Sequence, residues 1–154
     1  MKPILRPLLM AALLGVLILP APAGAAAVEL EWQAYDKGLA LAKAQGKKAF
    51  VYFYADWCTY CKMMEKETFG DPEAAAYLKA NFVLVRVNTD RAKKLARTYS
   101  AQALPTSWFL TPEGEKIKRI PGYAPVDFFM TAMKYIHSDA YKTMSFKDFK
   151  EKKP

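Results

Sequence analysis

The chain has only two cysteines, Cys58 and Cys61, and two residues separate them. Trp57 stands directly before the pair and Lys62 directly after it. A disulfide between residues so close in sequence closes a very small loop, so it removes little entropy from the unfolded chain and stabilises the fold little. Cysteines with this spacing are instead suited to exchange between a dithiol and a disulfide. The pair is therefore predicted to carry redox chemistry.

The surrounding residues predict that the pair lies where a strand meets a helix. Residues 49–54 are mostly β-branched or aromatic without polar alternation, which is typical of a strand buried on both faces. A helix from Cys58 to about Phe69 would direct backbone N–H groups and the positive end of its dipole at Cys58, lowering the pKa of that thiol below about 8.5. Cys61, one turn further, would be less exposed. Cys58 is therefore the predicted nucleophile and Cys61 the resolving thiol.

Three other roles for the two cysteines stay open. A structural disulfide is disfavoured by the small loop that it would close. A zinc or copper site would need more cysteine or histidine ligands, and the only histidine of the chain, His137, lies about 75 positions beyond the pair. Two buried and inert thiols would be unusual beside Trp57 in an exported protein. No metal or other cofactor is therefore expected.

Helices and strands are predicted to alternate on both sides of this junction. Apolar side chains recur at helical spacing in the helices, whereas the strands are short apolar runs. The predicted helices cover residues 29–45, 58–69, 71–81, 91–99 and 125–136, and the predicted strands cover residues 49–54, 82–88, 106–110 and 116–120. Residues 111–115 form a connection short enough for an antiparallel hairpin. This order predicts an α/β fold with a mixed central sheet and helices on both faces.

Residues 1–27 differ in composition from the rest of the chain. A lysine and an arginine precede an apolar run over residues 8–19, and small residues follow it. This is the layout of a secretory signal peptide. As a helix, the 12 apolar residues would span about 18 Å, too little for the roughly 30 Å core of a bilayer. The segment is therefore predicted to be cleaved after about Ala25 or Ala27, leaving a soluble protein in the periplasm.

One domain is predicted over residues 28–138, followed by a lysine-rich tail over residues 139–154 that is either a short helix or an ordered tail. The chain is basic, with 23 Lys and Arg against 15 Asp and Glu. Because the cations are scattered, most are expected to be solvated, and attraction to an acidic partner or anionic lipid would mainly affect encounter rates. Nucleic acid is not an expected partner, because no basic-aromatic motif appears. Nothing argues for a dimer, so a monomer is expected.

A second motif, Leu104-Pro105-Thr106, lies beyond the cysteine pair. A proline directly before an apolar strand is often only a strand-start residue, and on its own it leaves a cis or a trans peptide bond open. The order of strand, Trp-Cys-x-x-Cys-Lys, helix, strand, helix, Leu-Pro-Thr, hairpin and closing helix resembles the thioredoxin superfamily over about residues 29–137. Residues 54–72 are similar to exported thioredoxin-like domains such as the C-terminal periplasmic domain of DsbD-type thiol:disulfide interchange proteins.

The resemblance implies roles for further residues. It implies that Pro105 is cis and that the backbone of Leu104 pairs with the main chain of a substrate beside Cys58. Glu65 matches an acidic position that helps to handle protons near the disulfide, although a bare helix carboxylate is more often only a surface group. One position departs from the family: a buried aspartate commonly stands six residues before the first cysteine, where this chain has Tyr52. Proton transfer then needs water, Glu65 or the hydroxyl of Tyr52.

The function that these features favour is a periplasmic thiol:disulfide oxidoreductase that reduces protein disulfides. Its electrons are expected to come from a membrane or periplasmic donor protein. An oxidase or isomerase of the same fold stays open, because the residues between the cysteines differ from familiar pairs and do not indicate the direction of electron flow. A redox-silent module that holds peptides in a groove around Trp57 and Pro105, and a metal carrier, are alternatives from other classes.

Overall fold

The computed structural model describes residues 28–152, and the predicted export segment, residues 1–27, lies outside the described residues. The elements follow one another as α1 (Tyr35–Gln45), β1 (Ala49–Tyr54), α2 (Thr59–Glu67), α3 (Pro72–Asn81), β2 (Val83–Asn88), α4 (Lys93–Thr98), β3 (Thr106–Leu110), β4 (Lys116–Pro121), α5 (Val126–His137), the 3-10 helix η1 (Ala140–Lys142) and α6 (Phe146–Glu151). No helix within residues 28–152 is long and apolar enough to cross a membrane.

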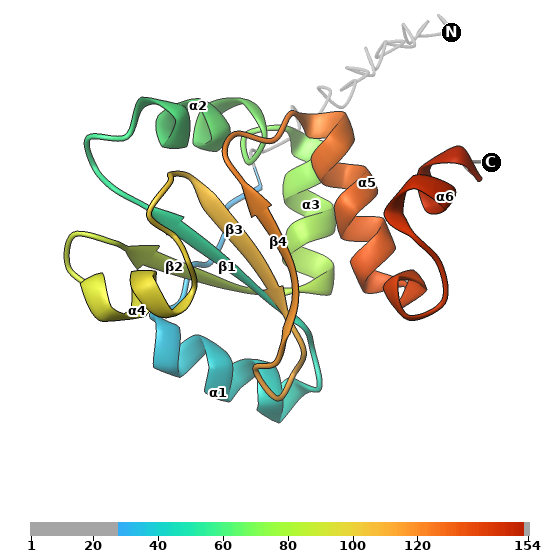
Figure 1. The fold of residues 1–154 in the computed structure, drawn as a ribbon, viewed down its shortest axis with the longest axis horizontal. Helices are drawn as coiled ribbons and strands as arrows, with labels where there is room; N and C mark the ends of the chain where they lie inside the picture. Colours follow the sequence, from blue (N-terminus) through green and yellow to red (C-terminus); the bar gives the residue numbers. More distant parts are fainter. Residues whose placement is uncertain (1–27, 153–154) are drawn as a thin grey trace, which may run out of the picture.

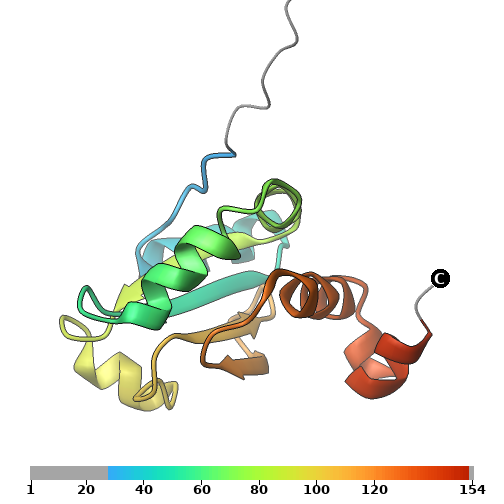
Figure 2. The ribbon, with the colours of Figure 1, turned by 90° about the horizontal axis from the view of Figure 1, so that it is seen from above.

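The four strands form one mixed sheet in the order β2-β1-β3-β4. β1 is parallel to β2 and antiparallel to β3, and β3 and β4 form an antiparallel hairpin. Residues of α1 and α4 pack on one face of the sheet, and residues of α2, α3 and α5 pack on the other. Figures 1 and 2 show these helices on either side of the strands. The structure therefore confirms the predicted α/β fold with helices on both faces.

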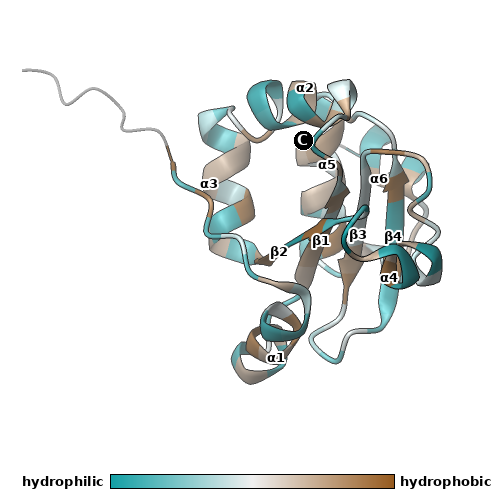
Figure 3. Cartoon of the chain, turned by 90° about the vertical axis from the view of Figure 1, so that its left-hand side faces the viewer, coloured by the Kyte–Doolittle hydropathy of each residue, from teal (hydrophilic) through white to brown (hydrophobic). Residues whose placement is uncertain are grey.

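β1 is the strand that carries the chain to the cysteine pair, and it is buried from both sides. Phe50 and Tyr52 point into the core beneath α2, α3 and α5, whereas Val51 and Phe53 point into the core beneath α1 and α4. Alternate residues of a strand face opposite sides, so a central strand with helices on both faces must be apolar throughout. Figure 3 shows the hydrophobic strands β1 and β3 between more hydrophilic outer elements, α2, α4 and β4. The chain thus leaves the core at Tyr54, the half-buried last residue of β1, a few residues before Cys58.

The helix predicted from Glu29 is wrong at its beginning, because α1 begins only at Tyr35. The residues before it are extended along the free edge of β2. The backbone N–H of Gln33 donates to the carbonyl of Leu84 at 2.8 Å, and the N–H of Arg86 donates to the carbonyl of Gln33 at 3.1 Å. These backbone hydrogen bonds stabilise the extended conformation, although the spacing of the apolar side chains favours a helix. Each other predicted boundary lies within about two residues of the observed one.

The tail forms η1 and α6. Of the two predicted alternatives, a short helix or an ordered tail, residues 146–151 form the short helix. The ring of Tyr135, on α5, lies 5.3 Å from the ring of Phe146 and 5.2 Å from that of Phe149. The hydroxyl of Tyr135 also donates to the carbonyl of Met144 at 2.7 Å. This segment therefore packs on the outer face of α5, at the right of Figure 1.

Candidate active site

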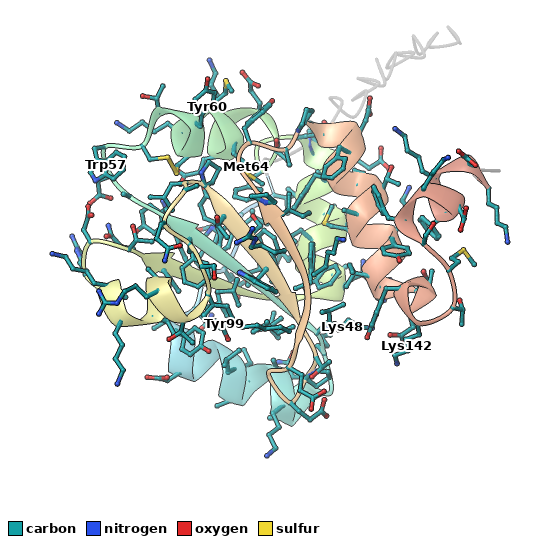
Figure 4. The ribbon with its side chains drawn as sticks, in the orientation of Figure 1. Lys48, Trp57, Tyr60, Met64, Tyr99 and Lys142 are labelled. Carbon is teal, nitrogen blue, oxygen red and sulfur yellow. A yellow bond between two sulfur atoms is a disulfide. The ribbon has the colours of Figure 1, made fainter. Side chains whose placement is uncertain are left out.

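Cys58 and Cys61 are joined by a disulfide at the amino end of α2 (Figure 4). Cys58 is the N-cap residue of the helix, and the backbone N–H of Cys61 donates to the sulfur of Cys58 at 3.1 Å. The side chains are almost equally buried, at 4% exposure for Cys58 and 1% for Cys61. Cys61 is less exposed than Cys58, as predicted, but the difference is small. What distinguishes the two sulfurs is the helix terminus, which directs an N–H donor at Cys58.

The Leu104-Pro105 segment lies at the same end of the sheet as the disulfide. Thr106, the first residue of β3, is paired with Phe53 near the end of β1, so the residues before β3 are next to the residues that follow β1. The peptide bond between Leu104 and Pro105 is cis, as the resemblance implies. Pro105 is buried and Leu104 is half-buried. The carbonyl of Pro105 accepts a 2.7 Å hydrogen bond from the N–H of Gly122, which ties this segment to the end of β4.

Two exposed aromatic side chains flank the disulfide. Trp57 is 68% exposed and Tyr60 is 60% exposed, and Figure 4 shows both on the outside of the molecule near the sulfur atoms. The indole N–H of Trp57 donates to a carboxylate oxygen of Asp90 at 2.9 Å. The backbone N–H of Asp90 in turn donates to the side chain of Asn88 at 3.0 Å. The loop after β2 thus fixes the orientation of an apolar surface beside Cys58.

Tyr52 lies beneath the resolving cysteine. Its side chain is fully buried, and its hydroxyl donates to the carbonyl of Cys61 at 3.2 Å. Burial raises the pKa of Tyr52 above its ordinary value, and the negative charge of Glu65 raises it further. The hydroxyl is consequently a neutral donor at physiological pH. It is not a ready proton acceptor.

Glu65, one turn beyond Cys61, is bound to a cation that the sequence did not indicate. A carboxylate oxygen of Glu65 lies 2.7 Å from Nη2 of Arg86, and both side chains are about one-third exposed. The guanidinium of Arg86 also lies 3.9 Å from the centre of the Tyr54 ring, a cation–π contact. Arg86 of β2 is paired with Tyr52 of β1. The ion pair with Arg86 therefore holds the carboxylate of Glu65 near Tyr52. The structure thus groups Tyr52 and Glu65 around Cys61.

Sequence reasoning missed three residues of β2 and the loop after it: Arg86, Asn88 and Asp90. The signal available for Arg86 was one cation within the apolar run of residues 83–87. Nothing local distinguished Asn88 or Asp90. Lys62, by contrast, was predicted to belong to the site, but its side chain is exposed and forms no ion pair within residues 28–152. In the part of the chain that the structure describes, no group of three or more His, Cys, Asp or Glu side chains is placed to hold a metal ion.

Comparison with known proteins decides the family. A family model described as a thioredoxin-like domain matches residues 35–137. The chain belongs to the thioredoxin-like family. The match begins at the first residue of α1 and ends at the last residue of α5, so it includes the cysteine pair, the cis peptide bond and the sheet that brings them together. The resemblance to the thioredoxin superfamily is thereby confirmed.

Curated relatives of this thioredoxin-like chain include two thiol:disulfide interchange proteins. DsbD 2 of Pseudomonas aeruginosa is 34% identical over 100 residues, which are 62% of this chain and 17% of the relative. DsbD of Vibrio vulnificus is 40% identical over 91 residues, which are 55% of this chain and 15% of the relative. The chain therefore spans about a sixth of the length of the curated relatives that it matches.

Solved structures of the same fold include a thioredoxin from Thermus thermophilus. It is 33% identical, with a TM-score of 0.64 over 70% of this chain and 86% of that one. The reduced C-terminal domain of DsbD from Neisseria meningitidis is 20% identical, with a TM-score of 0.56 over 64% of this chain and 90% of that domain. The second likeness shows the thioredoxin-like fold alone.

Proposed function

We propose that this chain is a periplasmic thiol:disulfide oxidoreductase that reduces disulfides in other proteins. The observation that carries the proposal is the Cys58–Cys61 disulfide at the amino end of α2, where the N–H of Cys61 is directed at the sulfur of Cys58. The names of the curated relatives, thiol:disulfide interchange proteins, support the same chemistry. The predicted export segment supports a periplasmic location.

The reaction moves two electrons in two exchange steps. The thiolate of Cys58 attacks one sulfur of the substrate disulfide, so that a bond between protein and substrate forms and the substrate S–S bond breaks. The other substrate sulfur leaves as a thiolate and takes a proton. Cys61 then loses its proton and attacks the sulfur of Cys58, which restores the disulfide seen in the structure and releases the second substrate thiolate. A dithiol on a donor protein returns two electrons to the Cys58–Cys61 pair by the same exchange.

The residues around the pair have distinct tasks in this scheme. The helix terminus stabilises the thiolate of Cys58 as nucleophile and as leaving group. Glu65 accepts the proton of Cys61, directly or through water, because the buried Tyr52 hydroxyl is already donating to the carbonyl of Cys61. The backbone of Leu104, before the cis bond to Pro105, pairs with the substrate main chain, as an extended peptide pairs with an open strand edge.

Insulin reduction in the presence of dithiothreitol tests the proposal. The wild-type chain should accelerate the precipitation of reduced insulin, and Cys58→Ser should not, because the attacking sulfur is gone. Thr143→Ser is the matched control, since Thr143 is exposed and lies in the tail segment. Equal rates for the wild type and Cys58→Ser would contradict catalysis and would favour a redox-silent peptide-binding module.

A further inference from the structure

Six exposed cations gather on the side of the sheet that α4 covers. They are named here the α4 basic face and comprise Arg91, Lys93, Lys94, Arg97, Lys116 and Arg119. Lys116 and Arg119 belong to β4, where they are paired with Leu110 and Trp108 of β3. Those two residues belong to the core beneath α1 and α4, so the cations of β4 lie on the α4 side of the sheet.

Hydrogen bonds join the two parts of this face. Nζ of Lys116 donates to the carbonyl of Thr98 at 2.7 Å, and Nη1 of Arg119 donates to the carbonyl of Ser100 at 3.2 Å. The ammonium of Lys116 also lies 4.6 Å from the centre of the Tyr99 ring. The cations of β4 are therefore held against the end of α4, where Arg97 also lies.

Two carboxylates adjoin this face in sequence: Asp90 precedes Arg91 and binds the indole of Trp57, and Glu115 precedes Lys116. None of its six cations forms an ion pair within residues 28–152. The sequence has no Asp or Glu from residue 91 to residue 112. Glu113 and Glu115 lie in the β3–β4 hairpin, at the end of the sheet opposite Cys58, where Lys116 begins β4. Lys93 and Arg97 are four positions apart in α4, and like charges at that spacing destabilise a helix by a few tenths of a kcal/mol. The spacing of Lys93 and Arg97 thus costs a little stability, which a negatively charged partner would offset.

The α4 basic face begins beside the cysteine pair. Arg91 directly follows Asp90, whose carboxylate holds the indole of Trp57, and Trp57 directly precedes Cys58. A partner that rests on this face therefore lies within reach of the sulfur of Cys58. This position fits a protein that must bring a disulfide to the site, and complementary charge there raises the rate of productive encounter.

We propose that the α4 basic face docks an acidic protein surface that borders the disulfide reduced by Cys58. The identity of that partner as a substrate rests on the proposed function. The recognised chemistry is a cluster of Asp or Glu side chains next to a cystine. Contact between carboxylates and the six cations orients the partner before the exchange step and leaves the exchange chemistry itself unchanged.

Two synthetic cystine peptides test this docking surface, one flanked by glutamates and one flanked by glutamines. At low ionic strength the wild type should reduce the glutamate peptide about tenfold faster, and the advantage should vanish near 1 M salt, where the screening length is about 3 Å. The double variant Lys94→Glu/Arg97→Glu should lose the preference and reduce the glutamine peptide at the wild-type rate. Its new carboxylate at position 97 lies four residues after Lys93, so a stabilising pair replaces a repulsive one and the variant should fold normally.

The control Lys150→Glu/Lys152→Glu makes the same change in net charge at the far side of the molecule, where α6 ends (Figure 1). It should keep the preference for the glutamate peptide. Fluorescence anisotropy of the same peptides with serine in place of cysteine reports docking without turnover, so a failure of the reductase activity is distinguishable from a failure of docking. Equal binding and equal rates for the two peptides, or binding to phosphatidylglycerol vesicles without a peptide preference, would overturn the proposal.

Discussion

At the scale of single residues, the site combines a buried hydroxyl with a carboxylate that is paired with an arginine. Tyr52 stands where the resemblance implies a buried aspartate, and it donates its hydroxyl hydrogen to the Cys61 carbonyl at 3.2 Å. Glu65, which lies 2.7 Å from Arg86, is the group that we propose receives the thiol proton. A carboxylate fixed by a cation is oriented, which favours proton transfer along one path.

Replacing Glu65 by glutamine should slow the resolution of the mixed disulfide by roughly tenfold or more, because the proton acceptor is lost while the shape is kept. Stopped-flow measurement of single turnovers with a peptide disulfide isolates this step. The same measurement over a range of pH should show that the deficit shrinks at high pH, where hydroxide replaces the missing base.

The matched control is Lys66→Gln, on the same helix with an exposed side chain. It should leave the single-turnover rate unchanged. Arg86→Lys retains the positive charge but not the paired geometry, so it should lie between the wild type and Glu65→Gln. An unchanged rate in Glu65→Gln would remove Glu65 from the mechanism.

Tyr52 predicts a pH dependence of stability. Burial raises the pKa of its hydroxyl in the folded state, whereas in the unfolded chain the hydroxyl ionises near pH 10. The folded state thus retains a proton that the unfolded state releases, so the stability that Tyr52 contributes is present below about pH 10 and falls as the pH rises further. Urea unfolding of the wild type and Tyr52→Phe at neutral and alkaline pH measures this difference.

In Tyr52→Phe, the free energy of unfolding at neutral pH should fall by about 1 kcal/mol, because one buried hydrogen bond is lost. Its decline above pH 10 should be shallower than that of the wild type. Part of the decline should remain, since burial and the hydrogen bond to Tyr99 also raise the pKa of Tyr35. Parallel declines in the two proteins would contradict the assignment to Tyr52.

The sequence alone was sufficient to single out Cys58 and Cys61, since their spacing and the flanking strand and helix are local features. It was not sufficient for Arg86 or Asp90. Arg86 contacts Glu65 because the register of β2 places Arg86 next to Tyr52 of β1. Asp90 binds the indole of Trp57 because β2 ends beside the site. Such partners depend on strand register, which no short stretch of sequence specifies.

At the scale of elements, α6 is an addition beyond the matched thioredoxin-like domain, which ends at residue 137. It packs on α5 at the opposite side of the molecule from α4 (Figure 1). Its aromatic side chains cover Tyr135 of α5. The segment is therefore expected to contribute to stability and not to the exchange reaction.

Phe149→Ala tests this role of α6. Because the ring is half-buried against Tyr135, its removal should lower the free energy of unfolding by about 2 kcal/mol, less than for a fully buried phenylalanine. Urea denaturation measures the change, and Lys150→Ala, an exposed neighbour, should change stability by less than about 0.5 kcal/mol. Insulin reduction should be unaffected by either variant. A loss of activity without a loss of stability would contradict a purely structural role.

Element boundaries were predictable where a local signal sets them. Asp71 caps α3 by accepting a 2.8 Å hydrogen bond from the N–H of Ala74, and Pro72 occupies the first turn, as their order in the sequence predicts. The beginning of α1 was not predictable in this way. The residues before Tyr35 carry helical spacing, and only the free edge of β2 makes them extended.

At the scale of the whole molecule, the sheet brings together segments that are far apart in sequence. The end of β1, the end of β2 and the beginning of β3 lie at the same end of the sheet. The cysteine pair follows β1, Asp90 follows β2 and the cis peptide bond precedes β3, so all three lie at that end. The order of elements was enough to predict a mixed sheet with helices on both faces, but not the strand order β2-β1-β3-β4. The distribution of charge was not predictable, because the α4 basic face combines cations from a helix and an edge strand that are distant along the chain.

The proposed direction of electron flow predicts the reduction potential of the whole protein. A reductase should have a potential near that of thioredoxin, about −270 mV, and well below the roughly −120 mV of a strong oxidant. Equilibration with glutathione or dithiothreitol buffers, followed by alkylation and mass spectrometry of Cys58 and Cys61, gives the value. A potential near that of the strong oxidant would contradict the reductase and favour an oxidase.

The central claim is that Cys58 attacks and Cys61 resolves, and trapping the mixed disulfide tests it most directly. Reduced Cys61→Ser should accumulate a one-to-one covalent adduct with a peptide disulfide, because the resolving sulfur is absent, and mass spectrometry should place the bond at Cys58. Cys58→Ser should form little adduct, and the wild type should pass through the adduct to the intramolecular disulfide. Preferential trapping through Cys61, or no adduct in either variant, would contradict the claim.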